Sequence, residues 1–494
     1  MTRVLLLNPP NELGYLNRDF MSGLGVAIQT ERNFMDGLIS KLKAGRRKMP
    51  VLSLAYLSSI LSKDTRIEVI DAANTEACAE DVINESVDIK PDFVFATSSI
   101  PSLYFEVKFL EKIKQSTDAI VGFIGEAASI FSEIILKKNN IDFIIKNEPE
   151  HIAKKIINEE DYSKIPGIVY KKDNKIKDTG NAQLIENLDE LPYPRWDYFP
   201  INKYGYFPIL KKKPFVTMLS SRGCPYGCIY CPYTTFMGKK WRARTPDNVI
   251  DEMIYIKHKF RIKSVLFRDP IFSLDKERVA KICEKMINDR INIEWACETR
   301  IDCLDENLLS IMAESGCKGI NVGIESTNPK ILSNVKRKNI TKDQIKKTIS
   351  QAKKNNIQIT GFFIFGLPGE TKKTIQDNIN FSLSIGLDYA EYKIATPFPG
   401  TELYRICVKR GWVNKITDLS NFPSFTSYNA YIKLNNISKE QIERYCSEAF
   451  KRFYFRREIM LQEIIKGNLL NFSLIKEMPK YTAYYLKNWL FKRF

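Results

Sequence analysis

Three cysteines stand close together near the middle of the chain, and their spacing could hold a metal. Cys224, Cys228 and Cys231 form a Cys-x3-Cys-x2-Cys pattern within the segment RGCPYGCIYCPY. Glycines inside this segment let the backbone curl so that three thiolates can converge. The segment directly follows an expected strand at 215–221, so we expect the cysteines on a loop at the end of that strand.

The number of ligands limits which metal this loop can hold. A structural zinc ion usually has four protein ligands, taken from two paired clusters or from cysteines and histidines. No second cysteine cluster follows, and the chain has only two histidines, His151 and His258. Three thiolates without an evident fourth ligand suit a cuboidal [4Fe-4S] cluster, whose fourth iron stays open to an exchangeable ligand. A zinc site and a chance clustering of structural cysteines are the alternatives.

The bulk composition is that of a multidomain globular protein. The 494 residues suggest about three units at roughly 150 residues each, and 44% of the residues are hydrophobic. The opening MTRVLLLNPP is typical of a first strand and not of a signal peptide, so we expect a cytoplasmic protein with reduced cysteines. The net charge of +17 suits nucleic acid, an anionic membrane or phosphate-bearing cofactors, but equally a lysine-rich solvated surface.

Residues 1 to about 150 alternate between short apolar strands and segments with helical spacing. This alternation predicts an α/β domain with a doubly wound parallel sheet of the Rossmann or flavodoxin type. The expected strands cover 3–9, 66–72, 92–99, 119–125 and 142–147, and the expected helices 51–63, 76–88, 103–116 and 127–138. Loops at the carboxyl ends of such strands form the ligand crevice. Here they are small and polar, although each alone also suits an ordinary turn.

The remainder of the chain predicts a connector, a second α/β domain and a helical tail. A hairpin around 173–174 and several prolines mark the connector. Six further strand–helix units predict a partial (β/α)6 barrel of the TIM type, with its mouth at the carboxyl ends of the strands. The expected strands cover 215–221, 264–269, 292–299, 319–325, 357–366 and 389–396, and the expected helices 247–259, 275–289, 304–315, 341–355, 371–385 and 401–410. Asp247, Thr341 and Thr371 suit helix N-caps.

The cysteine segment resembles the motif of radical S-adenosylmethionine (SAM) enzymes. CPYGCIYC has the spacing of that family, with the aromatic Tyr230 before the third cysteine. The resemblance implies that Cys224, Cys228 and Cys231 hold three irons while the open iron chelates SAM. One electron then cleaves SAM to a 5′-deoxyadenosyl radical, which abstracts hydrogen from an unactivated carbon.

Stretches along nearly the whole chain resemble the cobalamin-dependent members of this family. They are LLLNPP, VIDA, GEAAS, IDFIIKNEPE, IPGIVY, LDELPYPRWD, RARTPDNVIDEM, GIES, FGLPGET and PFPGTELY. The resemblance implies a cobalamin-binding domain over 1–155, a linker with a hairpin over 156–205, a radical SAM barrel over 206–415 and a helical region over 416–494. The implied cobalamin contacts are Asn8, Pro9, Ser98, Ser99, Gly125, Ser129 and Glu148. The loop 125–129 lacks the histidine often found there. The Asp-x-His-x-x-Gly motif is also absent and His151 is the only histidine of this domain, so the resemblance implies cobalt without a histidine ligand.

Further positions around the barrel mouth are candidates for binding SAM. Glu325 in GIES suits the amino group or ribose of SAM, and Arg300 suits its carboxylate, because a guanidinium matches carboxylate geometry. Gly366 suits a tight turn near the adenine, and Thr396 and Asp269 are further candidates at strand ends. Ion pairs within the protein are the alternative for the charged residues.

The resemblance implies C-methylation of an unactivated carbon. A radical cyclase that forms a ring in a tetrapyrrole or lipid is the alternative. An RNA methylthiotransferase fits less well, because Cys78 is the only cysteine of the first domain. A non-catalytic nucleic-acid binder is favoured only by the charge. The expected partners are a small-molecule or lipid substrate and a reductant such as ferredoxin or flavodoxin. The aromatic and basic end KYTAYYLKNWLFKRF could touch the inner face of an anionic membrane.

Overall fold

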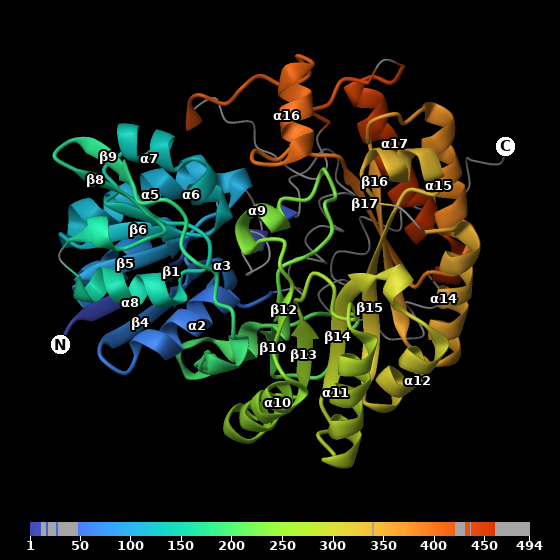
Figure 1. Ribbon diagram of the computed structural model, residues 1–494, viewed down its shortest axis with the longest axis horizontal. Coiled ribbons are helices and arrows are strands. Elements are labelled where there is room, and N and C mark those ends of the chain that lie inside the picture. Colours follow the sequence, from blue (N-terminus) through green and yellow to red (C-terminus); the bar gives the residue numbers. More distant parts are fainter. Residues whose placement is uncertain are drawn as a thin grey trace, which may run out of the picture.

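The computed structural model describes residues 1–10, 48–159, 161–337, 340–419, 430–434 and 436–459, with the backbone of 16–17 and 26–27. Figure 1 shows two lobes side by side, each built on its own sheet. Of the helical region expected over 416–494, residues 420–429, 435 and 460–494 lie outside the described residues. Within those residues, no helix is both long and apolar enough to cross a membrane.

The first lobe contains a seven-stranded sheet in the order β4-β1-β5-β6-β7-β8-β9. The first five of these strands in space run parallel, as the alternating pattern predicted. The strands are β1 (Arg3–Asn8), β4 (Arg66–Asp71), β5 (Phe93–Thr97), β6 (Ile120–Ile124), β7 (Phe143–Ile145), β8 (Ile168–Lys172) and β9 (Lys175–Asp178).

Helices cover both faces of this sheet, which explains the apolar runs in its strands. In β1, Leu6 packs in one hydrophobic core and Leu5 in the other, because successive side chains of a strand point to opposite faces. The helices are α2 (Leu52–Leu61), α3 (Ala72–Thr75), α4 (Ala79–Ile89), α5 (Leu103–Thr117), α6 (Glu126–Ile130), α7 (Ser132–Lys138) and α8 (Glu150–Asn158). The helix expected at 127–138 is therefore two helices, which meet at Phe131.

The order of the strands locates the ligand edge of this sheet. Because β1 pairs with β4 on one side and β5 on the other, the chain winds outward from β1 in both directions. Asn8 and Thr97 thus end neighbouring strands at the switch point, where open α/β sheets bind ligands. The hairpin expected around 173–174 is present as β8 and β9, but it belongs to this sheet and not to a separate connector, because β8 pairs antiparallel with β7.

The second lobe contains six parallel strands in sequence order, as expected for a partial barrel. They are β10 (Phe215–Met218), β13 (Ser264–Phe267), β14 (Glu294–Arg300), β15 (Cys317–Glu325), β16 (Gln358–Phe365) and β17 (Tyr389–Ile394). The helices around them are α10 (Pro246–Phe260), α11 (Lys276–Asn288), α12 (Glu306–Glu314), α13 (Pro329–Asn334), α14 (Lys342–Lys354), α15 (Lys372–Ser384), α16 (Glu402–Lys409) and α17 (Lys439–Tyr454).

Two of the three predicted N-caps of this lobe are correct. Thr341 accepts from the backbone of Gln344, and Thr371 forms a capping box. The third prediction is wrong. Helix α10 begins one residue earlier than expected, with Pro246 at its first position, so Thr245 is the cap and Asp247 lies in the first turn.

The segment after β17 joins the two lobes. In Figure 1, α9 (Tyr233–Met237) lies between the sheets and α16 lies above the boundary. Phe398, Ile416 and Leu419 pack against the core of the first lobe, and the amide of Leu403 donates to the carbonyl of Ile229 in the cysteine loop. This segment therefore contacts both the first sheet and the loop that carries the cysteines.

Candidate functional site

The three cysteines lie on a loop that leaves the carboxyl end of β10 through the short strand β11 (Ser221–Arg222). Gly223 turns the chain into this loop with φ +84, and a Cβ there would lie 1.9 Å from the Lys240 carbonyl oxygen. Only glycine fits this approach. The amide of Cys231 donates to the carbonyl of Cys228 at 3.1 Å, which folds the loop back on itself.

The electrostatics of the loop suit a strongly cationic metal group. Burial, together with the neighbouring thiolates of Cys228 and Cys224, raises the pKa of Cys231 to about 12. Burial also raises the pKa of Cys224, against the opposing charges of Arg300 and Arg337. Three thiolates therefore need compensating positive charge in order to form together here, and iron supplies it.

The spacing of the thiols bears on which metal group fits. Among the described residues, no three or more His, Cys, Asp or Glu side chains are arranged to hold a single metal ion. Thiolates that bind different irons of a cuboidal cluster lie farther apart than the ligands of one ion.

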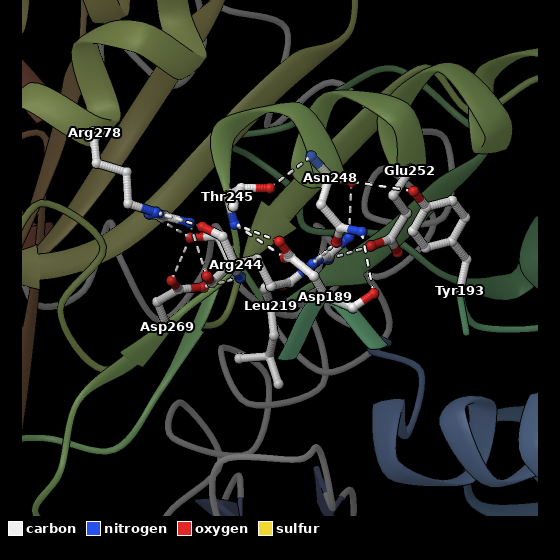
Figure 2. A network of polar contacts seen from close by, with 10 residues as sticks. Asp189, Tyr193, Leu219, Arg244, Thr245, Asn248, Glu252, Asp269 and Arg278 are labelled. Atoms are coloured by element: carbon white, nitrogen blue, oxygen red, sulfur yellow. Dashed lines mark hydrogen bonds and ion pairs between the residues drawn. The ribbon is translucent and has the colours of Figure 1, made fainter. Parts of the chain in front are cut away.

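A buried polar network fixes the start of the loop (Figure 2). Asp269 accepts from the amide of Ser220 at 2.8 Å and from the hydroxyls of Ser220 and Ser221 at 2.6 Å each. Arg278 donates to the Ser220 carbonyl at 2.8 Å. Asp269 was expected to face the barrel mouth; it is instead fully buried and bound to the serines before the cysteine loop.

The same network reaches the connector through Arg244 (Figure 2). Arg244 donates to the Leu219 carbonyl at 2.9 Å and forms a buried ion pair with Glu252. Its Nε donates to Asn248 Oδ1 at 2.6 Å, and Asp189 of the connector accepts from the amide of Thr245 at 3.0 Å. The residues before the cysteines are therefore held by the barrel and the connector together.

Two glutamates of the first lobe hold Arg222, two positions before Cys224. The guanidinium lies 3.1 Å from Glu148 and 2.6 Å from Glu150, and its side chain is 1% exposed. Arg242 lies 3.0 Å from the other oxygen of Glu148. Glu148 was expected to contact cobalamin. Both of its carboxylate oxygens are instead bound within the protein, so it joins the two lobes.

The other expected cobalamin residues lie at the ligand edge of the first sheet in two groups. Gly125 has φ +104, and a Cβ there would lie 3.4 Å from Ser98 Oγ, which itself accepts from the amide of Ala128 at 3.1 Å. Ser129 donates to the carbonyls of Gly125 at 2.8 Å and Ile145 at 3.1 Å. Ser98, Gly125 and Ser129 are thus brought together, with their polar groups bound inside the loop.

The second group surrounds the end of β1. Asn8 donates to Asp71 at 2.6 Å and accepts from Thr97 at 3.3 Å, and Pro9 follows it. Ser99 donates to Glu106, an acidic residue in the first turn of α5, at 2.8 Å. A ligand at this edge would therefore meet small side chains and backbone more than charged groups.

One buried acid at this edge was not singled out from the sequence as a site residue. Glu126, 3% exposed, follows Gly125, and burial raises its pKa to about 8. The hydroxyl of Thr235, on α9 after the cysteines, lies 2.6 Å from Glu126 Oε1 and 2.5 Å from the Pro232 carbonyl. A single hydroxyl hydrogen cannot serve two acceptors at these distances. A protonated Glu126 that donates to Thr235 satisfies both contacts.

The expected SAM residue Glu325 lies in a charged group beside the cysteines. Tyr230 hydrogen-bonds to Glu325, a contact that the sequence motifs did not predict. Arg337, which the sequence analysis missed, lies 3.8 Å from Glu325, donates to the Gly323 carbonyl at 2.7 Å and hydrogen-bonds to Cys228. Its Nε is buried without a hydrogen-bond partner among the described residues.

Arg300 approaches the same group from β14. It forms a two-bond ion pair with Asp302, at 2.9 and 2.6 Å, and lies over the ring of Tyr226 at 3.9 Å. The structural ion pair considered as an alternative is therefore present. Its Nη1 is nevertheless buried, and no described residue accepts from it.

Asn378 on α15 joins two loops at the barrel mouth. Its Oδ1 accepts from the amide and hydroxyl of Thr327, at 2.7 and 2.8 Å, just after Glu325. Its Nδ2 lies 3.4 Å from Glu370, whose other oxygen accepts from the amide of Gly366. Gly366 has φ +86 and so forms the tight turn predicted for it.

Thr396 follows the last barrel strand. Its hydroxyl donates to the Ile394 carbonyl at 3.1 Å, and the residue is buried. The hydroxyl of Thr396 therefore stabilises the local turn after β17.

Comparison with known proteins identifies the class. Residues 218–382 match the model of the Radical SAM superfamily, a span that contains the cysteine loop, Glu325 and Gly366. The chain is a radical SAM enzyme, and such enzymes use a [4Fe-4S] cluster and SAM.

Individual relatives cover most of the chain. It is 29% identical to an uncharacterized methyltransferase, PH0819, of Pyrococcus horikoshii, over 84% of this chain and 90% of that protein. It is 24% identical to an anaerobic magnesium-protoporphyrin IX monomethyl ester cyclase of Rubrivivax gelatinosus, over 89% and 79% respectively. Its fold matches that of the radical SAM methyltransferase TsrM from Kitasatospora setae, whose structure was solved with cobalamin and a [4Fe-4S] cluster. The TM-score is 0.65 and the sequence identity is 17%, over 84% of this chain and 80% of that one.

Proposed function

We propose that the chain is a cobalamin-dependent radical SAM methylase that adds a methyl group to an unactivated carbon. The observation that carries this proposal is the contact between the ligand edge of the first sheet and the cysteine loop, made by Glu126 with Thr235. A corrinoid at that edge would share one reaction space with SAM, which gives the proximity that methyl transfer needs. When bound, the cluster would supply an electron to SAM and the corrinoid would supply the methyl group.

Residues beside the cysteines suit the charged end of SAM. Arg300 and Arg337 each bring one buried N–H group without a partner among the described residues, and both act electrostatically on Cys224. A carboxylate between them would satisfy both groups. Glu325 would then take the amino group, in keeping with its place next to Tyr230 and Cys228.

The first lobe suits a corrinoid bound without a histidine. Both histidines of the chain, His151 and His258, are exposed on helices. The edge itself offers small residues, of which Gly125 and Ser98 are central. We assign residues 1–155 to corrinoid binding and residues 206–415 to the SAM chemistry.

A ring-forming cyclase is the second candidate. The cyclase of Rubrivivax gelatinosus aligns over 462 residues, including both lobes, although at 24% identity against 29% for the methyltransferase of Pyrococcus horikoshii. Both candidates need a one-electron reductant, for which ferredoxin or flavodoxin is suitable.

Anaerobic reconstitution with iron, sulfide and a corrinoid tests the proposal. We expect about four irons per chain, retention of the corrinoid on gel filtration and formation of 5′-deoxyadenosine from SAM under reduction. Incubation with deuteromethyl SAM and metabolite extracts then separates the candidates, because methylation adds the labelled group to a product and cyclisation does not. A reconstituted protein that does not bind corrinoid and does not cleave SAM would rule the proposal out.

A further inference from the structure

Each barrel strand turns alternate side chains toward the barrel interior, and three polar residues share that face. Arg300 of β14 points into the barrel mouth, where its guanidinium lies over the ring of Tyr226 in the cysteine loop. Glu298 is two positions earlier on the same strand and therefore shares this inward face. Glu298 pairs in register with Asn321 of β15, and Asn321 pairs with Thr360 of β16. We call Glu298, Asn321 and Thr360 the polar row.

The connector closes the barrel just below this row. The hydroxyl of Tyr206 accepts from Asn321 Nδ2 at 2.7 Å. Ile209 lies so close to Gly319 that a Cβ on that glycine would be 2.4 Å from its Cγ2. Gly319 is two positions before Asn321 and faces the same way. The polar row is thus the floor of the barrel interior.

Two atoms of the polar row lack the partners that buried polar atoms usually have. Asn321 and Thr360 are each 2% exposed, and neither Asn321 Oδ1 nor Thr360 Oγ1 has a hydrogen-bond partner among the described residues. Such atoms cost stability unless a ligand or water satisfies them. Glu298 forms an ion pair with Arg268 and still keeps 19% of its side chain exposed, so this depth is reachable from the barrel interior.

The orientation of the Asn321 amide defines what the row can bind. Its Nδ2 lies 3.4 Å from Glu298 Oε1, and the reverse orientation would place two oxygens together. Asn321 Oδ1 and the Glu298 carboxylate therefore both present acceptors, while Thr360 can donate or accept. A ligand with hydroxyl or amino hydrogens matches this set, whereas a carboxylate or phosphate would bring further lone pairs against it.

We propose that the polar row recognises a hydroxyl- or amino-bearing group of the substrate. This inference rests on the proposed function, since it assumes that substrate enters the barrel. Asn321 is four positions before Glu325 on β15, which places the row about 13 Å from the group beside the cysteines. A polar molecule of about that length would reach from the floor to SAM. The row selects against purely hydrocarbon and anionic substrate ends.

Binding of small probes to the reconstituted holoenzyme tests this inference without knowledge of the substrate. The probes are glucosamine, citrate and toluene, followed by saturation-transfer NMR at equal millimolar concentration. We expect glucosamine alone to receive saturation, and its affinity to fall at least about fivefold in Thr360→Val and Asn321→Leu. Thr360→Ser, which keeps the hydroxyl, should restore binding. Thr348→Val on α14 is the matched control, because Thr348 is a buried threonine outside the barrel face.

Three results would overturn the inference. The first is equal binding of citrate or toluene, and the second is wild-type glucosamine affinity in Thr360→Val. The third is no probe binding at all, which would mean that the row holds only ordered water. Reductive SAM cleavage without substrate is measured on the same samples. If the wild type cleaves SAM but binds the three probes equally, the result counts against the polar row alone. If the wild type does not cleave SAM, the result counts against the proposed function.

Discussion

The carboxylate of Glu148 lies 3.1 Å from the guanidinium of Arg222, across the boundary between the two lobes. Burial works against the charged form of Glu148, but Arg222 and Arg242 overcome it and hold its pKa below the usual value. Since Arg222 is two positions before Cys224, the first lobe helps to fix where the cysteine loop begins. Cluster binding and docking of the lobes are therefore linked through one buried ion pair.

Replacement of Glu148 by glutamine should loosen the cysteine loop. The change removes the negative charge that pairs with the buried side chains of Arg222 and Arg242. Breaking a buried ion pair in this way costs about 3–5 kcal/mol of unfolding free energy. We expect lower iron content after reconstitution and a lower midpoint in urea. Glu186→Gln, which removes an exposed pair with Lys240, is the control and should stay within about 0.5 kcal/mol of wild type. Equal iron content in both variants would contradict the link.

Replacement of Cys228 by alanine should abolish the cluster. Two remaining thiolates cannot hold three irons, so the brown chromophore and deoxyadenosine formation should both be lost. Cys407→Ala, which changes a buried cysteine on α16, should keep both. Deoxyadenosine formation at the wild-type rate in Cys228→Ala would show the assignment of the loop to be wrong.

Replacement of Arg337 by glutamine should weaken SAM binding. Loss of a charge-assisted hydrogen bond costs about 1.5–3 kcal/mol, so the dissociation constant should rise about 10- to 100-fold. Iron content is measured in parallel, because Arg337 also contacts Cys228. Lys336→Gln removes the exposed neighbouring charge and should leave SAM affinity unchanged. An unchanged affinity in Arg337→Gln with the cluster intact would exclude it from the SAM site.

The alternation of apolar strands and helical segments was enough to predict both sheets, because the hydrophobic periodicity of a strand or helix depends only on residues that are close in sequence. It could not predict strand pairing. The hairpin at 173–174 was recognised, but nothing local shows that β8 joins β7 instead of standing alone in the connector. Similarly, Thr245 and Asp247 both suit an N-cap, and the position of Pro246 decides between them only once the helix start is known.

The candidate site could be located where its residues belong to short motifs. The cysteines and Glu325 come from two such motifs, and the fold brings Cys228, Cys231 and Glu325 close to Tyr230. The ion pair of Glu148 with Arg222 could not be predicted, because the two residues are 74 positions apart and no local pattern reveals their contact. Arg337 was missed because it stands among other cations in NVKRKN, where only the fold shows which one turns toward the cysteines.

The isosteric change Asn378→Asp should disturb the barrel mouth. It keeps the acceptor for Thr327 but removes the Nδ2 donor that lies 3.4 Å from Glu370 Oε1 and places a second carboxyl group there. We expect the KM for SAM to rise several-fold, with iron content unchanged. A second change, Glu370→Gln, provides an amide that can donate to Asp at position 378 and should recover most of the loss. Asn380→Asp, on the same helix but in an exposed pair with Gln376, is the control.

The double change separates positioning from general destabilisation. If Asn378 only stabilises the fold, the two substitutions should add, because each removes a native contact. A coupling energy of about 1 kcal/mol or more in the KM for SAM would instead show that the amide–carboxyl contact sets the loop geometry. Additive effects on KM would contradict the positioning role.

The buried acid Glu126 predicts a pH dependence of stability. Burial raises its pKa to about 8 in the folded state from 4.5, so the folded protein holds a proton that the unfolded chain releases above about pH 4.5. The stability from this proton is full at low pH and is lost as pH rises toward 8. Glu126→Gln keeps a hydrogen-bond donor for Thr235 at every pH and should remove this slope.

Urea unfolding of the apoprotein under anaerobic conditions at several values between about pH 5 and 9 measures the effect. The difference in unfolding free energy between Glu126→Gln and wild type should grow with pH in favour of the variant and level off above about pH 8. Glu370 titrates in the same range but is present in both proteins, so the difference isolates Glu126. Glu133→Gln, an exposed change on α7, should run parallel to wild type. A Glu126→Gln curve that also runs parallel would mean that the carboxyl is already ionised at neutral pH, and that Thr235 donates to it instead of to Pro232.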